Sequence, residues 1–158
     1  MPGLNLAPMV QDDYPRFLTL VAETYAGGAD RAGEMTHAQA MERARQDLQA
    51  LLPNALETPS MLLRTLLVGA DVAGHIWLGV RGPDSGRYGW VWDVYVDPHH
   101  RGHGYGAEAM RLVEDEARAV FGVSEIRLNV FAANQAAVRL YGRLGYVVTS
   151  QVMRKAIG

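Results

Sequence analysis

Apolar residues recur along the chain with two different periods. In the first third they follow helical spacing, and residues 11–25 form an apolar stripe behind a polar cap, which predicts a helix that Gly27-Gly28 end. Thr36 is a good N-cap and Pro53 a helix breaker, so a second helix is predicted between them. Residues 4–10 predict a short strand ahead of both helices.

The pattern becomes strand-like in the second third of the chain. Three stretches rich in β-branched and aromatic residues, separated by turn residues, predict strands over 61–68, 74–80 and 88–96. Further on we expect a helix to residue 121, a strand over 125–131, a helix over 134–144 and a final strand over 146–153. The order β-α-α-β-β-β-α-β-α-β predicts one α/β (α+β) domain, residues 1–158, whose mixed, mainly antiparallel sheet carries helices on its faces.

Composition excludes several classes of function. The 158 residues suffice for one hydrophobic core, and a formal net charge of −2 provides no field that would attract nucleic acid or an anionic membrane. The absence of cysteine excludes disulfides, thiolate metal sites and a cysteine nucleophile. No apolar run approaches the roughly 18 residues of a membrane span, and the first residues do not resemble a signal peptide. We therefore expect a cytoplasmic protein.

The most informative segment joins the strand that ends at Val96 to the following helix. It reads Val94-Tyr95-Val96-Asp97-Pro98-His99-His100-Arg101-Gly102-His103-Gly104-Tyr105-Gly106. Glycines let backbone approach a ligand, and the free N–H groups and dipole of a helix start suit a phosphate or pyrophosphate. The spacing is not G-x-G-x-x-G and no Gly-Lys-Ser/Thr follows, so the dinucleotide and P-loop motifs are excluded. A glycine-rich helix entry that binds no ligand is the alternative.

Two motifs carry a resemblance to a known family. Arg101-x-x-Gly104-x-Gly106, after a strand that ends Val-Tyr-Val, resembles motif A of the GCN5-related N-acetyltransferases (GNAT). Asn134-x-x-Ala137-x-x-Leu140-Tyr141-x-x-Leu144-Gly145-Tyr146 resembles motif B of the same family. The specific match covers residues 90–146, and the element order extends it over the chain. The resemblance implies the GNAT fold, with six to seven strands, about four helices and a splay between the fourth and fifth strands.

The resemblance also implies how acetyl-CoA would bind. Its pantetheine arm would lie between the splayed strands and pair with the backbone of Val94, Tyr95 and Val96. Its pyrophosphate would accept hydrogen bonds from N–H groups at the helix start, at Gly102, His103, Gly104, Tyr105, Gly106 and Ala107. Arg101 would add positive charge there or be a solvated turn residue. Asn134 would contact the cofactor, cap its own helix, or do both.

Acetyl transfer from a thioester to an amine needs a base or water chain, a donor for the oxyanion and an acid for the leaving thiolate. The family commonly places a tyrosine at the position of Tyr141, so the resemblance favours it as the acid, whereas periodicity alone places it in an apolar stripe. Asp93 interrupts a strand, and by alternation we expect it to share a face with Val91 and Tyr95. Its carboxylate could take the amine proton, hold a cationic substrate or make a structural hydrogen bond.

Departures from better-known relatives bear on the acceptor. Asn129 stands where ribosomal-protein N-terminal acetyltransferases tend to carry a glutamate, and Trp90 stands near the glutamate of histone-acetylating members. The expected acceptor is therefore the primary amine of a small molecule, with a peptide N-terminus or a lysine as the alternative. His75 is expected to be structural. No metal site is predicted, because the histidines of the glycine turn lack acidic or thiol partners in register: His99, His100 and His103.

The family usually builds its acceptor pocket from the first two helices, the loop between them and the turn before the final strand. That region contains Tyr25, Gly27, Gly28, Asp30, Arg31, Glu34 and Met35. Asp30 and Glu34 could attract a cation or belong to a polar loop. Three tryptophans could line an apolar cleft or fill the core, and the core is the favoured expectation: Trp77, Trp90 and Trp92.

Two rival functions remain at this point. The chain could be a non-catalytic acyl-CoA-binding sensor that kept the cofactor site and lost turnover, although Tyr141 and Asp93 argue against loss of turnover. It could also be a structural dimerisation module with no affinity for the cofactor. Exposed edge strands would permit a homodimer in any of these cases.

Overall fold

The computed structural model of the chain describes residues 3–31, 33 and 35–158, without the side chains of residues 29–31. Its sheet has five strands in chain order: β1 (Leu4–Pro8), β2 (Met61–Val68), β3 (Asp71–Arg81), β4 (Tyr88–Val96) and β5 (Ile126–Leu128). The first three pairings are antiparallel, and β5 pairs with β4 in parallel. The mixed, mainly antiparallel sheet is confirmed, and the prediction of six to seven strands is wrong for the described residues.

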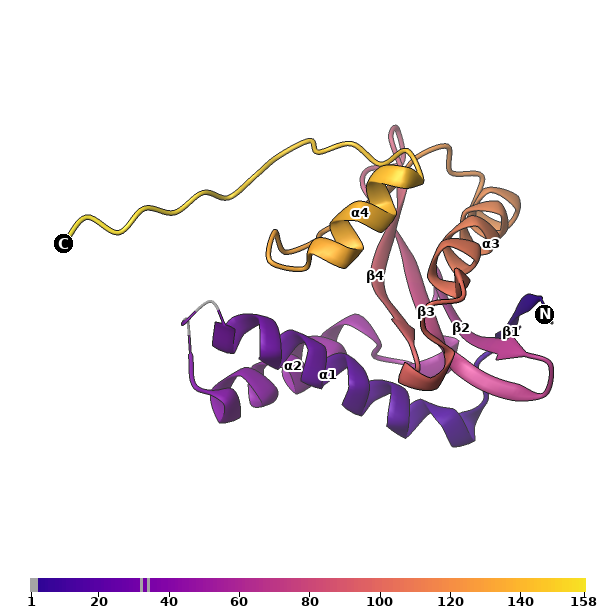
Figure 1. Cartoon of the computed structure of the whole chain (residues 1–158). Helices are drawn as coiled ribbons and strands as arrows, with labels where there is room; N and C mark the ends of the chain where they lie inside the picture. Colours follow the sequence, from indigo (N-terminus) through magenta and orange to yellow (C-terminus); the bar gives the residue numbers. More distant parts are fainter. Residues whose placement is uncertain (1–2, 32, 34) are drawn as a thin grey trace.

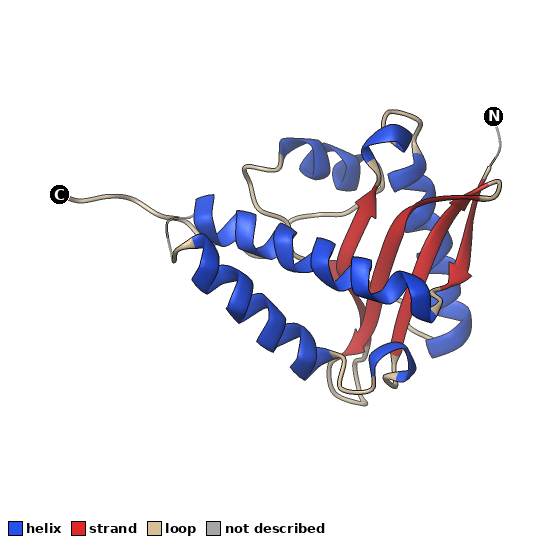
Figure 2. Ribbon diagram, turned by 90° about the horizontal axis from the view of Figure 1, so that it is seen from below, coloured by secondary structure: helices blue, strands red, loops and turns tan. Residues whose placement is uncertain are grey.

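Four α-helices cover the two faces of this sheet, as predicted (Figure 1). They are α1 (Tyr14–Arg31), α2 (His37–Leu51), α3 (Tyr105–Phe121) and α4 (Gln135–Arg143). The helices α1 and α2 lie together across one face, as Figure 2 shows, and α3 and α4 cover the other. Three short 3-10 helices complete the described elements: η1 (Gln11–Asp13), η2 (Ala55–Glu57) and η3 (Pro98–His100). Among the described residues no helix is both long and apolar enough to cross a bilayer.

The sheet separates two hydrophobic cores. One lies between the sheet and α3, where Met110 and Val113 of the helix pack on Ile76 and Leu78 of β3. The other lies between the sheet and the α1–α2 pair and includes Trp77 of β3. Alternation along β3 produces this division, because successive side chains of a strand point to opposite faces. The expectation that Trp77 lies in the core is confirmed, since this residue is fully buried.

The first helix extends past the point where its glycines were expected to end it. Gly27 and Gly28 lie inside α1, which ends at Arg31. A Cβ atom at Gly28 would lie 3.0 Å from the Phe131 ring, so glycine here permits a close tertiary contact rather than a helix end. The start of α2 follows the prediction, because Thr36 forms a reciprocal capping box with Gln39.

One irregularity in β4 changes which side chains share a face. The register with β3 shifts between the pairs Trp77↔Asp93 and Leu78↔Val91, which leaves Trp92 as an extra residue. Val91 packs in the α3-side core, whereas Trp92 and Asp93 both lie on the α1 side. The prediction that Asp93 shares a face with Val91 is therefore wrong, because a bulge interrupts strand alternation.

The C-terminal part of the chain departs furthest from the predicted elements. The predicted strand over 125–131 is shortened to Ile126–Leu128, and the predicted final strand over 146–153 does not form. Residues 147–158 are all exposed and extend away from the body of the molecule (Figure 1). The apolar residues that predicted this strand are present, but in one copy of the chain they have no partner strand among the described residues.

Candidate active site

The strands β4 and β5 stay together for only three residue pairs. These pairs are Gly89↔Ile126, Trp90↔Arg127 and Val91↔Leu128. Residues 92–96 of β4 continue without a partner on that side in the part of the chain that the structure describes, and we call them the open β4 edge. This divergence is the predicted splay between the fourth and fifth strands. It leaves backbone N–H and C=O groups of a central strand available to an extended ligand.

The side chains of the open β4 edge are divided between the two faces. Val94 and Val96 pack against the α3-side core, while Tyr95 lies on the α1 side and stacks on His75 at 5.5 Å. Their backbone therefore sits at the boundary between two packed layers, where the predicted pantetheine pairing requires it. Arg101 donates from Nε to the Val96 carbonyl oxygen at 2.8 Å, so it ties the turn to the strand end.

The glycine turn forms an open helix start. Gly104 is the N-cap of α3, and both it and Gly102 have left-handed backbone, with φ of 80° and 79°. A Cβ atom at either position would meet nothing within 4 Å, so the space in front of this turn is open. A glycine cap has no side chain to accept hydrogen bonds from the first N–H groups of the helix. The turn can therefore bind an anion such as a pyrophosphate.

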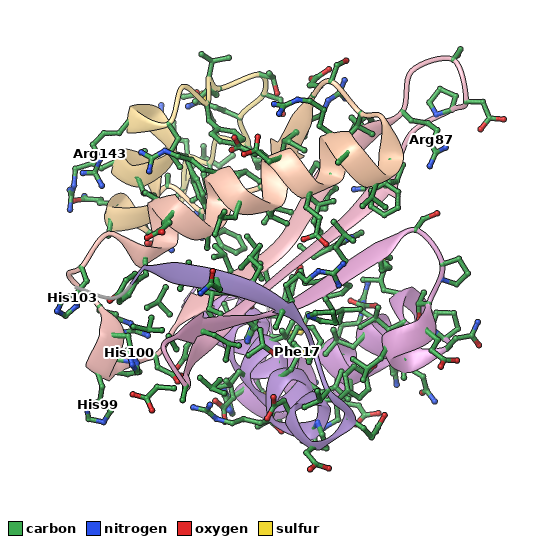
Figure 3. All side chains as sticks on the ribbon, turned by 90° about the vertical axis from the view of Figure 1, so that its right-hand side faces the viewer. Phe17, Arg87, His99, His100, His103 and Arg143 are labelled. Carbon is green, nitrogen blue, oxygen red and sulfur yellow. The ribbon has the colours of Figure 1, made fainter. Side chains whose placement is uncertain are left out.

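Other residues of the turn serve packing. The Tyr105 ring is buried in the α3-side core, so only its backbone can face a ligand. His103 stacks on Tyr105 at 5.7 Å and pairs through Nδ1 with the His100 carbonyl oxygen at 3.2 Å. Figure 3 shows His99, His100 and His103 spread along the turn. Within the described residues no three His, Asp or Glu side chains gather as a metal site would require.

The carboxylate of Asp93 is paired with a histidine that sequence reasoning did not connect to it. His75 Nε2 and Asp93 Oδ2 lie 2.5 Å apart, and both side chains are more than nine-tenths buried. Phe17 packs edge-on against the His75 ring at 4.9 Å and holds it from the α1 side. The available signal was the presence of two ionisable residues on neighbouring apolar strands, but only the strand register brings them together.

Two tyrosines on different helices have a raised pKa to which the Asp93 carboxylate contributes. Burial and then the Asp93 carboxylate raise the pKa of Tyr141, on α4, to about 12. Burial, Asp93 and then Asp47 raise the pKa of Tyr25, on α1. Tyr141 also packs against the α3-side core, as the periodicity predicted, and its role as the acid stays a prediction. Because its pKa is high, Tyr141 keeps its proton at neutral pH and can act as an acid but not as a base.

Asn134 is the N-cap of α4. Its side-chain oxygen accepts a hydrogen bond from the Ala137 N–H at 3.2 Å, so the capping role is confirmed. The contact of Asn134 with a cofactor stays a prediction.

The predicted acceptor region is described in part. Tyr25 belongs to the site through its interaction with Asp93, and the contact of Phe131 with Gly28 joins the loop after β5 to α1. Glu34 and the side chains of Asp30 and Arg31 lie outside the described residues.

Two of the tryptophans predicted for the core are only partly buried. Trp90 and Trp92 are half-buried, and the Arg81 guanidinium lies over both rings at 4.8 and 5.3 Å. Trp92 also stacks on the buried Trp77 at 5.4 Å, so this aromatic group continues from the core toward the surface.

Comparison with known proteins agrees with this architecture. A family model described as "Acetyltransferase (GNAT) family" matches residues 29–146. The "Uncharacterized N-acetyltransferase YycN" of Bacillus subtilis is 30% identical over 155 residues, which cover 98% of this chain and 99% of the relative. The solved structure of YycN superposes with a TM-score of 0.90 at 29% identity, over 98% of this chain and 99% of that one. The chain belongs to the GNAT family of acetyltransferases.

Two further GNAT comparisons are shorter and have more specific names. An "L-methionine sulfoximine/L-methionine sulfone acetyltransferase" of Salmonella typhimurium is 36% identical over 72 residues, covering 46% of this chain and 42% of the relative. The catalytic subunit of an N-terminal acetyltransferase B complex from Arabidopsis thaliana is 31% identical over 86 residues, covering 54% and 49%. The family assignment makes the chain an acyltransferase, and the open β4 edge with the start of α3 is its candidate active site.

The coupling of Asp93 to the tyrosines predicts a pH-dependent signal. Removing the carboxylate charge in Asp93→Asn should lower the pKa of Tyr141, but leave it above 10 because burial is the larger cause. The pKa of Tyr141 is raised from 10 to about 12 in the folded state, so the protonated tyrosine stabilises the fold below pH 10. This contribution to stability is lost as the pH rises from 10 toward 12.

The pKa of Tyr141 can be followed by ¹³C NMR of the tyrosine ring, with Tyr141→Phe identifying the resonance. Asp97→Asn is the matched control, because Asp97 follows the same strand and pairs with Arg16 but is not a cause of the tyrosine shift. An unchanged Tyr141 titration in Asp93→Asn would show that the two groups do not share a site.

Proposed function

We propose that this chain transfers an acetyl group from acetyl-CoA to the primary amine of a small molecule, by direct attack in a ternary complex. The observation that carries the proposal is the adjacency of three features at one edge of the sheet. These are the open β4 edge, the uncapped glycine start of α3, and Asp93 with Tyr141, whose raised pKa the Asp93 carboxylate contributes to. Each supplies a different requirement of acyl transfer: cofactor binding by backbone, anion binding, and proton transfer.

The described residues are suited to hold coenzyme A. The backbone of Val94, Tyr95 and Val96 would pair with the pantetheine amides, and the N–H groups from Gly102 to Ala107 would bind the pyrophosphate. Open space in front of Gly102 and Gly104 supports this placement, since a side chain there would enter the phosphate position. Bound acetyl-CoA supplies an activated thioester carbonyl for the amine to attack.

The proton transfers are assigned to two side chains. Asp93 accepts the proton that the ammonium nitrogen loses, and His75 holds the carboxylate in place through its Nε2 contact. As the new C–N bond forms and the C–S bond breaks, the Tyr141 hydroxyl would deliver its proton to the departing sulfur, and the second proton that the nitrogen loses would restore the tyrosine hydroxyl. Backbone N–H groups freed by the bulge at Trp92 are the proposed donors to the oxyanion.

The acidic surroundings of Tyr25 support a cationic acceptor. Both Asp93 and Asp47 contribute to the raised pKa of this tyrosine, and because Asp47 pairs with Arg43, Asp93 is the carboxylate proposed to attract an ammonium group there. A small acceptor is favoured by the relative named for methionine sulfoximine, and by Asn129, which cannot accept a proton at neutral pH. The Arabidopsis relative supports the second candidate, a peptide N-terminus.

A turnover screen tests the proposal directly. Release of free thiol from acetyl-CoA would be measured against amino acids, polyamines, aminoglycosides and peptides. Turnover on a small amine supports the proposed function, and turnover confined to peptides favours the second candidate. Coenzyme A binding without turnover on any panel would indicate an acyl-CoA sensor.

Coenzyme A affinity should depend on the glycine that caps α3. Gly104→Asn should weaken binding at least tenfold, about 1.4 kcal/mol, because the new side chain would occupy the pyrophosphate position. Asparagine tolerates left-handed backbone, which limits strain. Gly122→Asn is the matched control, since Gly122 has φ of 68° and open surroundings at the other end of the same helix. Calorimetry that shows equal affinities for both variants would place the cofactor elsewhere.

Turnover should depend on Asp93 in a pH-dependent way. Asp93→Asn should reduce kcat most at low pH, where fewer amines are already neutral, and should change coenzyme A affinity little. The measurement is a pH–rate profile on an acceptor from the screen. A variant profile with the same shape and height as that of the wild type would leave Asp93 with a structural role only.

The hydroxyl of Tyr141 should matter far more for rate than for stability. Tyr141→Phe keeps the ring that packs against Tyr146 and the core, and removes only the proton donor. General acid assistance is worth about 10²–10⁴-fold, so kcat should fall by that order while Tm and coenzyme A affinity change little. Tyr146→Phe is the control, since the Tyr146 hydroxyl donates to Glu114 on α3. Wild-type kcat in Tyr141→Phe would exclude the general-acid role.

A further inference from the structure

Arg81, the last residue of β3, is exposed and takes part in no ion pair among the described residues. Its guanidinium lies over the rings of Trp90 and Trp92, at 4.8 and 5.3 Å from their centroids. These ring contacts hold the arginine in place, but aromatic faces do not replace the acceptors that its N–H groups require. Arg81 can therefore bind an anion from solution.

The two tryptophan rings beneath Arg81 extend toward the candidate active site. We call Trp90 and Trp92 the tryptophan platform, and their ring centroids lie 6.0 Å apart. Gly79 of β3 allows Trp92 to lie close to the sheet, because a Cβ atom there would come within 2.9 Å of Trp92 Nε1. Trp92 directly precedes Asp93, and both lie on the α1 side of the sheet. The tryptophan platform therefore connects the proposed base to Arg81.

The two ends of the tryptophan platform carry opposite charges, that of Asp93 and that of Arg81. Asp93 lies opposite Trp77 in the strand register, and Arg81 is four residues beyond Trp77 on β3, so roughly 13 Å of strand separates the two positions. The Arg81 side chain shortens this separation, because its guanidinium reaches back over Trp92. A ligand that meets both charges must therefore carry its ammonium group and its anionic group several bonds apart.

We infer that Arg81 binds a carboxylate of the acceptor, and that the acceptor is an ω-amino carboxylate, with its amine and its carboxylate at opposite ends of a short chain. The inference rests on the proposed function, which places the acceptor amine at Asp93. A guanidinium fork matches the two oxygens of a carboxylate, and the rings hold this fork in position before the ligand arrives.

The part of the acceptor between its two charges would lie on the tryptophan platform, where aromatic faces cover its methylene groups. An α-amino acid cannot span the platform, because its amine and its carboxylate are joined to one carbon atom. Chain length should therefore decide how much a carboxylate improves an acceptor.

Matched pairs of acceptors test this assignment. Each acid is compared with its own carboxamide, which has the same length and no negative charge: β-alanine, γ-aminobutyrate and ε-aminocaproate. In the wild type, the ratio of kcat/KM for the acid to that for the amide should rise with chain length, to about tenfold for a pair that spans the platform.

Variants of Arg81 should change this preference for the acid. Arg81→Gln should abolish it, whereas Arg81→Lys, which keeps the charge but lacks the fork, should retain part of it. Arg87→Gln is the matched control and should keep the wild-type ratio. Arg87 is an exposed arginine in the loop between β3 and β4 that lies over neither ring (Figure 3).

A binding measurement separates this inference from the proposed function. The probe is ε-acetamidocaproate, which carries the carboxylate but has no free amine, so its binding does not require turnover. In the presence of coenzyme A it should shift the Arg81 Nε–H signal in NMR spectra, with Arg81→Gln identifying that signal. The neutral ε-acetamidocaproamide should leave the signal unchanged.

The outcomes distinguish the two proposals. Absence of turnover on every acceptor would contradict the proposed function, and the NMR signal would then decide the inference, since a shift supports a carboxylate site at Arg81 and no shift excludes it. Where turnover occurs, equal kcat/KM for acid and amide at every chain length would overturn the inference. A preference for the acid that survives in Arg81→Gln would overturn it as well, because another group would then bind the carboxylate.

Discussion

The separation of β4 from β5 after Val91 is the constraint on which the candidate site depends. A central strand of a sheet normally forms backbone hydrogen bonds with both neighbouring strands. A ligand can pair with it only where one of these neighbours ends or diverges. Here β5 ends at Leu128 after three pairs, and the bulge at Trp92 begins where the pairing stops. The open edge then leads directly into the turn whose glycines expose the N–H groups of α3. Backbone geometry therefore forms the proposed cofactor site, with little demand on side-chain identity.

The bulge also determines which chemistry can reach this edge. It places Asp93 on the α1 side together with Trp92, where His75 on β3 can meet the carboxylate. Tyr141 lies on α4, on the opposite side of the sheet, yet the Asp93 carboxylate contributes to its raised pKa. The proposed base, Asp93, and the proposed acid, Tyr141, are thus packed on separate sides of the sheet.

Much of this arrangement could be predicted from local sequence. The capping box at Thr36, the strand at residues 88–96 and the helix after the glycine turn follow from short-range chemistry, and the two motifs predicted where the candidate site lies. The predictions that were wrong all concern features that depend on contacts between distant parts of the chain. Gly28 lies inside α1, where the absence of a Cβ atom leaves room for the Phe131 ring, and the pairing of Asp93 with His75 depends on a strand register that alternation cannot supply once a bulge intervenes. The final strand failed because a strand needs a neighbour, which local pattern does not guarantee.

The shortness of β5 has opposite effects on its two sides. Toward β4 it creates the open edge, but toward the exterior it leaves Ile126 and Leu128 only half covered. A longer β5 would cover the core and close the site, so the two requirements conflict within one chain.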